Sequence, residues 1–181
     1  QPLWQSAQQL DRIRRAYIQQ LLPILIDYAP RLSDSLSKIS LHYHAGWAQD
    51  SDLLTHWESH IEQDRQMGFT QAGPHRADLK IKVDGRDALA VLSRGQQKVL
   101  AILLLLVQTA DFTQQLGASP ILLLDDLPAE LDQVHRERVI ALLPSLGCQS
   151  FLTTTDHNAF ANLSDAVYWQ FFQGKKTVCF D

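Results

Sequence analysis

The sequence predicts a mixed α/β fold (α+β mixed), in which parallel core strands follow a mainly helical lobe with one short strand. Three observations support this prediction. Apolar residues recur every three or four positions in residues 3–30, as in an amphipathic helix. Strand-like and helix-like patterns alternate in residues 88–155, which is typical of parallel sheets. Residues 121–124 are all apolar, as in a strand covered on both faces.

The composition indicates a folded protein in a reducing compartment. The chain has 181 residues, of which 45% are hydrophobic and 20% charged, so it can bury a core and is not disordered. Its net charge of -4 gives no overall attraction to nucleic acid, so any DNA contact needs a local patch. Two cysteines, Cys148 and Cys179, do not form a disulfide framework, and we expect a cytoplasmic protein.

The N-terminus lacks the pattern of a signal peptide. The apolar run 99–107 is shorter than the roughly 20 residues that span a bilayer, so we expect no membrane partner. Residue 1 is not Met, and the chain opens inside a helical pattern. We therefore expect a fragment of a longer protein.

Residues 1–70 are predicted to form the helical lobe. The helix at 3–30 contains Pro23, which would kink it or start a second helix. Alternating residues predict a strand at 38–44, and a second amphipathic helix is expected at 52–67. The cap of this helix is Asp50, Ser51 or Asp52, and its inward residues are Leu53, Leu54, Trp57 and Ile61.

Two histidines, His42 and His44, share the polar side of the strand at 38–44. Such a pair could share a metal ion. No Cys or carboxylate stands at ligand spacing beside them, which favours solvated histidines over a metal site.

Residues 71–181 are predicted to form the α/β part. A strand at 78–83 leads through Asp84-Gly85, a hairpin turn signal, into a return strand at 88–92. The helix from 94 to about 115 is apolar nearly all round, so we expect it to be buried on all sides. A helix at 131–143, a strand at 148–153 and a hairpin around Gly174 (166–171 with 177–180) follow. The inward residues of the helix at 131–143 are Leu131, Val134, Val139 and Leu142 or Leu143.

The segment Ser93-Arg94-Gly95-Gln96 opens the long apolar helix. A helix N-terminus offers unpaired N–H groups and a partial positive charge, and glycine allows close approach to the backbone. A terminal phosphate would suit this position. The alternative is an ordinary capped helix.

Two carboxylates, Asp125 and Asp126, end the apolar strand at 121–124. Ligands of open α/β sheets bind at the carboxyl ends of strands. One carboxylate on Mg²⁺ and one that orients a water would suit phosphoryl transfer. The alternative is a pair that caps a neighbouring helix.

These segments resemble the motifs of the ABC-type ATPase head, in the same order. Residues 92–96 resemble the signature motif LSGGQ, residues 121–126 look like the Walker B strand, and residues 128–132 resemble the D-loop. Residues 124–132 and the Gly-Pro-His-Arg-Ala-Asp at 73–78 look like the RecF family, which is related to the SMC and Rad50 heads. The resemblance covers essentially the whole chain.

The resemblance implies a role for each matched residue. Ser93, Arg94, Gly95 and Gln96 would contact ATP held by the opposite subunit, and Asp132 would reach across the dimer. Asp125 would hold Mg²⁺. Asp126 stands where most ABC proteins carry Glu and would polarise the attacking water. Thr155 lies near the position of the γ-phosphate sensor. Arg94 departs from the glycine of the usual signature. His75, Arg76 and Asp78 have no assigned role, and form either a structural cluster or a ligand contact.

The implied whole protein is a recombination mediator in DNA repair, replication and the SOS response. It would bind ATP and Mg²⁺, form an ATP-dependent homodimer, bind double-stranded DNA near single-stranded DNA gaps, and help load RecA with RecO and RecR. Residues 1–70 would be the end of its arm, and residues 71–181 part of its ATPase head. The candidate basic residues are too scattered in sequence to name a patch: Arg12, Arg14, Arg15, Arg65, Lys80 and Lys82.

The phosphate-cradling motif Gly-x-x-x-x-Gly-Lys-Ser/Thr is missing from the chain. We therefore expect negligible ATP hydrolysis by this polypeptide alone. Two alternatives stay open: the nucleotide-binding subunit of a transporter, which would carry Glu at 126, and a non-catalytic interaction module.

Overall fold

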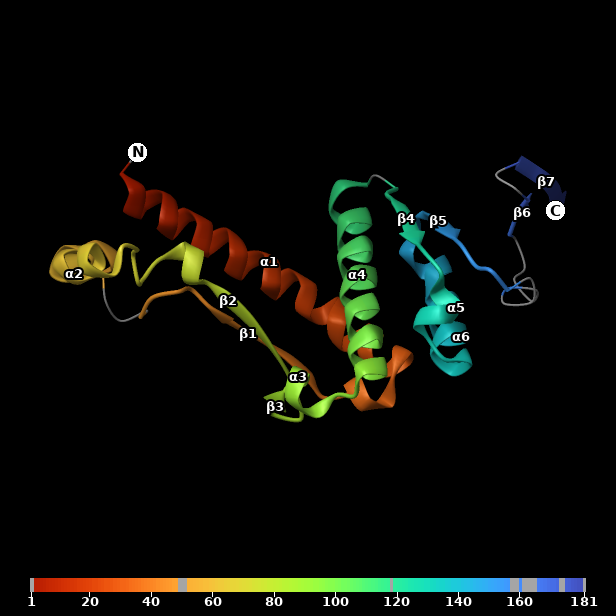
Figure 1. The fold of residues 1–181 in the computed structure, drawn as a ribbon, viewed down its shortest axis with the longest axis horizontal. Coiled ribbons are helices and arrows are strands. Elements are labelled where there is room, and N and C mark those ends of the chain that lie inside the picture. Colours follow the sequence, from red (N-terminus) through yellow and green to blue (C-terminus); the bar gives the residue numbers. More distant parts are fainter. Residues whose placement is uncertain are drawn as a thin grey trace.

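The computed structural model describes residues 2–48, 52–117, 119–156, 160, 166–172 and 175–180. The fold is arranged around the long helix α1 (Leu3–Leu32). The helix continues through Pro23 and Pro30, so no second helix begins at Pro23. In Figure 1, α1 runs diagonally from the N-terminus towards the upright helix α4, and the C-terminus lies at the opposite end of the molecule.

A small antiparallel sheet lies along α1. Strand β1 (Ile39–His44) pairs with β2 (Asp78–Val83) in the register Ile39↔Val83, and β2 pairs with β3 (Arg86–Asp87). The predicted strands at 38–44 and 78–83 are therefore confirmed. Figure 1 shows β1 and β2 running below the middle of α1.

The predicted return strand at 88–92 is wrong. After the turn at Asp84 and Gly85, which both have positive φ, β3 lasts only two residues and a short helix α3 (Ala88–Val91) follows. The Asp87 carboxylate accepts a hydrogen bond from the Leu89 N–H at 2.9 Å. This cap starts a helix where the apolar run alone suggested a strand.

Helix α2 (Leu53–Met67) is capped by Asp52, whose carboxylate accepts a hydrogen bond from the Thr55 N–H. Leu53 is buried, but Ile61 is 50% exposed, so its predicted inward position is wrong. The reason is the position of α2 beyond the N-terminal end of α1, away from the core (Figure 1).

The Gly-Pro-His-Arg segment makes local structural contacts. Pro74–Arg76 forms a 3₁₀ turn, η2, whose Pro74 carbonyl accepts from Arg14 Nη1 at 2.8 Å. His75 Nε2 lies 2.8 Å from the Thr70 carbonyl, and the Arg76 guanidinium lies over the Phe69 ring. These contacts favour the structural alternative for His75 and Arg76. Asp78 is the first residue of β2.

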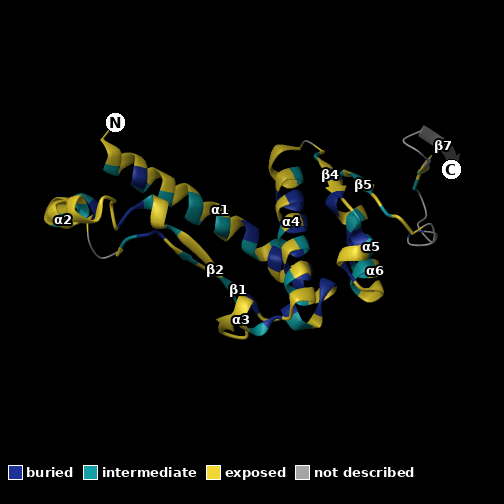
Figure 2. Ribbon diagram, viewed as in Figure 1, coloured by how far each residue is buried: buried dark blue, intermediate teal, exposed yellow. Residues whose placement is uncertain are grey.

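Helix α4 (Arg94–Leu116) ends at Gly117 in the left-handed conformation. It is not buried on all sides, which corrects the prediction. Leu103 and Leu106 are fully buried, whereas Leu105 and Phe112 are 41% and 44% exposed. Figure 2 shows the two kinds of residue alternating along α4. The reason is that α4 packs mainly against α1 among the described elements, so Leu105 and Phe112 on its other sides stay exposed.

The whole of α4, 23 residues, is long and apolar enough to cross a membrane by length and composition, although the run at 99–107 alone is not. Buried core helices meet the same criterion, so this is a weak sign. α4 contributes eight buried residues, Val99, Leu100, Leu103, Leu106, Val107, Thr109, Ala110 and Asp111.

Strands β4 (Ile121–Leu124) and β5 (Gln149–Leu152) are parallel, as predicted. Leu122 and Leu124 are buried, but Ile121 and Leu123 are 63% and 68% exposed. The expectation of a strand covered on both faces is therefore wrong for this chain, because only the face with Leu122 and Leu124 joins the core formed by the described residues.

Two helices connect these strands, α5 (Leu127–Glu130) and α6 (Gln133–Leu142), followed by the 3₁₀ turn η3 (Leu143–Leu146). Within α6, Val139 and Leu142 are buried as predicted, but Val134 is 56% exposed. Val139 follows Val134 by five positions, about 140° around the helix, so the two residues cannot share one buried face. The closing hairpin is present as antiparallel β6 (Tyr168–Phe172) and β7 (Lys175–Phe180), and Gly174 lies outside the described residues.

One hydrophobic core joins α1 to the α/β part. Leu25, Tyr28 and Leu32 of α1 belong to the same buried cluster as Leu103 of α4 and Val139 of α6. Polar contacts cross the same seam: Gln20 Nε2 donates to the buried Asp111 carboxylate at 2.6 Å. Burial is the main cause that raises the pKa of the Tyr17 hydroxyl, and the negative charge of Asp111 raises it further. The second half of α1 therefore packs as part of the core, and a division at residue 70 stays a prediction.

Candidate functional site

The two strand-end carboxylates lie in the turn between β4 and α5. Thr153, directly after β5, ties this turn together: its hydroxyl donates to Asp125 Oδ1 and accepts from the Asp126 N–H at 2.9 Å. The Thr153 N–H in turn donates to the Leu124 carbonyl at 3.1 Å. The parallel pairing of β4 and β5 thus brings one hydroxyl and two carboxylates to the same edge of the sheet.

Asp126 has a left-handed backbone, with φ 44° and ψ 43°. Among residues other than glycine, Asp and Asn tolerate this region best. Its side chain makes no capping hydrogen bond to α5 and is partly exposed. The Asp126 side chain therefore does not cap α5, which argues against the helix-capping alternative for this residue.

The helix N-terminus at Ser93 forms a complete capping box. Ser93 Oγ accepts from the Gln96 N–H at 3.3 Å, and Gln96 Oε1 accepts from the Ser93 N–H at 2.9 Å. The ordinary capped helix is therefore present in this chain. Gly95 is exposed, and a Cβ built there would meet no atom within 4 Å. Arg94 is also exposed, so the helix start presents an open surface to an anion.

The two candidate segments are linked but not in contact. Lys98, one turn into α4, forms an ion pair with Glu130 of α5 at 2.7 Å. Ser93 is the N-cap of α4, and Asp126 lies between β4 and α5. Within the described part of the chain, no hydrogen bond joins Ser93 to Asp126. The two candidate segments are thus connected through the Lys98–Glu130 ion pair between α4 and α5.

Asp132 is the N-cap of α6. Its Oδ1 accepts from the His135 N–H at 2.9 Å, and its Oδ2 lies 2.8 Å from His135 Nδ1. These hydrogen bonds, the backbone one first, lower the pKa of the Asp132 carboxyl. Because the pKa of Asp132 is lower in the folded state than in the unfolded state, its ionised carboxylate stabilises the fold at pH values above the unfolded-state pKa. This stabilisation is lost as the pH falls through the folded-state pKa.

Thr155 is exposed and lies two residues beyond the residue that the structure places at the site. The role of Thr155 stays a prediction, and sequence analysis did not single out Thr153, whose hydroxyl contacts Asp125 and the Asp126 N–H. The available signal was a hydroxyl directly after the second parallel strand, at the same sheet edge as Asp125. His42 Nε2 lies 3.2 Å from Ser40 Oγ, and His44 Nδ1 accepts from the Gly46 N–H. Within the described residues no group of three or more potential metal ligands is found.

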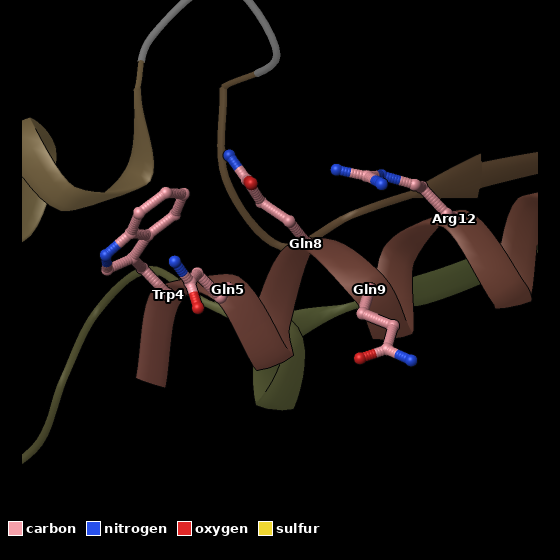
Figure 3. Close-up of a pocket in the computed structure, with 5 residues that line it drawn as sticks. All are labelled: Trp4, Gln5, Gln8, Gln9 and Arg12. Atoms are coloured by element: carbon pink, nitrogen blue, oxygen red, sulfur yellow. The ribbon is translucent and has the colours of Figure 1, made fainter. Parts of the chain in front are cut away.

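A surface hollow lies far from these residues, along the first three turns of α1. Figure 3 shows its lining side chains, Trp4, Gln5, Gln8, Gln9 and Arg12. Nothing in it resembles the strand-end carboxylates.

Thr153→Val should destabilise the chain by about 1 kcal/mol, because two hydrogen bonds of a partly solvated hydroxyl are lost. Urea unfolding followed by circular dichroism measures this. Thr155→Val is the matched control, because its hydroxyl makes no hydrogen bond among the described residues. Equal stability of the two variants would show that the Thr153 link contributes nothing.

Comparison with protein families identifies the chain's relatives. The family described as RecF/RecN/SMC N terminal domain matches residues 9–178. The DNA replication and repair protein RecF of Pseudomonas aeruginosa (strain LESB58) is 42% identical over 151 residues, which are 83% of this chain and 41% of the relative. RecF of Thioalkalivibrio sulfidiphilus (strain HL-EbGR7) is 38% identical over 170 residues, 94% of this chain and 47% of that one.

Solved structures agree on the fold. The structure of the recombination mediator protein RecF-ATP in the RecFOR pathway matches with a TM-score of 0.76 at 23% identity, over 97% of this chain and 48% of that chain. The RecF-ATPrS structure matches with a TM-score of 0.74 over the same shares. This chain thus spans less than half the length of these relatives. The predicted resemblance to RecF is confirmed, and the chain belongs to the RecF/RecN/SMC family.

Proposed function

We propose that the chain is the C-terminal portion of a RecF-type recombination mediator, a cytoplasmic DNA-repair protein. The complete protein binds ATP and Mg²⁺, dimerises around ATP, binds DNA and helps load RecA at gapped DNA together with RecO and RecR. Residues 1–70 are the end of its arm, and residues 71–181 are part of its ATPase head.

The observation that carries the proposal is the placement of Asp125 and Asp126 at the carboxyl end of β4, fixed by Thr153 directly after β5. Asp125 supplies an oxygen ligand for Mg²⁺ at this edge, and Mg²⁺ supplies charge that offsets the developing negative charge of phosphoryl transfer. Asp126 orients and polarises the attacking water. Thr153 holds the relative position of the two acids, and Thr155 is the candidate γ-phosphate sensor.

The second part of the site acts in trans. Ser93, Arg94, Gly95 and Gln96 face a nucleotide held by the other subunit, where the helix N-terminus and the Arg94 charge stabilise the phosphate. Separate positions for Ser93 and Asp126 within one chain are what a site shared between two subunits requires.

The proposal also accounts for the exposed apolar faces. Leu105 of α4 and Leu123 of β4 are exposed in a chain that lacks the phosphate-cradling motif and spans less than half of its relatives. In the complete head, further elements would cover them. The transporter alternative has lost its support, because the relatives are RecF proteins and residue 126 is Asp.

ATP turnover tests the proposal. The chain alone should release negligible phosphate from Mg-ATP, and a mixture with the N-terminal half of the head should release it steadily. Failure of the mixture, although the halves associate, would favour a non-catalytic interaction module.

DNA binding is tested separately by salt titration of the complete protein. Affinity that depends on phosphate contacts should fall steeply as salt rises. Affinity that is independent of salt, or no binding at all, would contradict the DNA role.

A further inference from the structure

We propose that His135 is a positioning residue for Asp132 and that it fastens this carboxylate to the end of α1 through Ser33. The inference rests on the proposed function, in which Asp132 reaches a nucleotide site shared with a second subunit. His135 itself touches no nucleotide in this proposal.

One residue holds both oxygens of the Asp132 carboxylate. Oδ1 accepts from the His135 N–H at 2.9 Å, and Oδ2 lies 2.8 Å from His135 Nδ1. The Asp132 side chain is 64% exposed, whereas that of His135 is 20% exposed. An exposed acid samples several rotamers unless a less mobile neighbour restrains it. His135 is therefore placed to present the carboxylate to solvent in one orientation.

The other side of the imidazole contacts α1. His135 Nε2 lies 3.3 Å from Ser33 Oγ, and Ser33 is the C-cap of α1, with its N–H donating to the Ala29 carbonyl at 2.9 Å. Ser33 is 5% exposed, and its hydroxyl also lies 2.9 Å from Ser35 Oγ. The ring is thus fixed by a buried group on a different element.

A second side chain of α6 strengthens the same attachment. Arg138, almost one turn after His135, donates to the Leu32 carbonyl at 3.4 Å and lies 3.7 Å from the Asp34 carboxylate. Together His135 and Arg138 bind three consecutive residues at the end of α1. A displacement of that end would therefore move the start of α6 and Asp132 with it.

The order Ser33–His135–Asp132 resembles that of a nucleophilic triad, but the burial excludes this role. A substrate carbonyl has no route to a serine that is 5% exposed. The hydroxyl also contacts Ser35, which leaves it less available as a nucleophile. Positioning is the role that the contacts support.

The link is compatible with both charge states of His135. Its Nδ1 must carry a proton to donate to the Asp132 carboxylate. Nε2 then accepts from the Ser33 hydroxyl when the ring is neutral, and donates to it when the ring is protonated. The charged groups around the ring are Asp132, Arg138 and Asp34.

The first test measures the pKa of the Asp132 carboxyl by carbon-detected NMR on the chain. In His135→Ala the pKa should rise, yet stay below its ordinary value, because the backbone N–H of residue 135 still donates. Val134→Ala is the matched control on the same turn, at an exposed position, and should leave the pKa unchanged. An unchanged pKa in His135→Ala would overturn the inference.

The second test measures ATP turnover after the N-terminal half of the head is restored. His135→Ala and Ser33→Ala should each lower kcat by about tenfold with little change in KM, because the carboxylate is misplaced rather than removed. His135→Asn, whose amide can replace the Nδ1 donor, should recover part of the loss. A merely structural role of the ring predicts no such rescue, and its absence would count against the inference.

Asp132→Ala distinguishes the positioning role of His135 from the role of Asp132 in the shared site. If it lowers turnover while His135→Ala behaves as wild type, the positioning role is wrong and the proposed function stands. If Asp132→Ala itself has no effect, the role of Asp132 in the shared site is wrong, and the inference fails with it.

Discussion

Asp126→Asn should lower ATP turnover by at least about 100-fold once the chain is combined with the N-terminal half of the head. The amide keeps the size of the side chain but loses the charge that, in the proposed function, polarises the attacking water. Asn also tolerates the left-handed backbone at this position, where φ is 44°, so the turn between β4 and α5 should be preserved. Steady-state phosphate release measures the effect.

Asp84→Asn is the matched control for this prediction. Asp84 is the other described non-glycine residue with positive φ, at 50°, and its carboxylate forms an exposed ion pair with Lys38 at 3.2 Å. The same chemical change there should leave turnover at the wild-type level. Full activity of Asp126→Asn would contradict the assigned role. Turnover by the chain alone that Asp126→Asn abolishes would contradict the need for a second half.

Gly46→Ala should destabilise the chain by about 3 kcal/mol. Gly46 has φ +94°, and a Cβ there would lie 2.1 Å from the Gly73 carbonyl oxygen and 2.7 Å from the Ala77 nitrogen. Both obstacles are backbone atoms. The Gly73 N–H also donates to the Gly46 carbonyl at 3.0 Å, so the two loops cross at this point. Separation of the loops would disturb the Pro74–Arg76 turn that Arg14 holds against α1.

Gly85→Ala isolates the steric part of this cost. Gly85 has φ +77°, but a Cβ there meets nothing within 4 Å. Its replacement should cost only the backbone strain, about 1 kcal/mol. Urea unfolding of both variants gives the comparison. If Gly46→Ala is no less stable than Gly85→Ala, the close crossing of the two loops does not limit stability.

Local patterns predicted most of the elements. The two ends of α4 could be predicted because Ser93 caps its start and Gly117 ends it in the left-handed conformation, and both signals are local in sequence. Apolar alternation placed β1 and β2, and the pairing of Ile121–Leu124 with Gln149–Leu152 followed from the alternation of strands and helices.

Burial was harder to predict, because it depends on what packs against an element. Leu105 and Leu123 belong to apolar runs that indicate full burial, yet both are exposed. Their sequence neighbourhood carries no information on which partners are present. The helix α3 was missed because the single hydrogen bond from Leu89 to Asp87 outweighs the strand propensity of a short apolar run.

The residues of the candidate site were proposed from local sequence patterns, whereas the hydrogen bonds between them could not be predicted. Asp125 and Asp126 were recognised from an apolar strand followed by two acids. The link through Thr153 depends on the register of β4 against β5, and the link from Asp132 to Ser33 joins residues about a hundred positions apart. Such contacts are set by tertiary packing rather than by local sequence.

Equilibrium titration with Mg-ATP tests the central claim most directly, on the chain alone and on the chain mixed with the N-terminal half of the head. The account predicts no measurable binding by the chain alone. In the mixture it predicts ATP affinity above that of the N-terminal half alone, because Ser93 and Asp125 complete the site. Tight binding by the chain alone would contradict the account, and so would a mixture that binds no better than the N-terminal half.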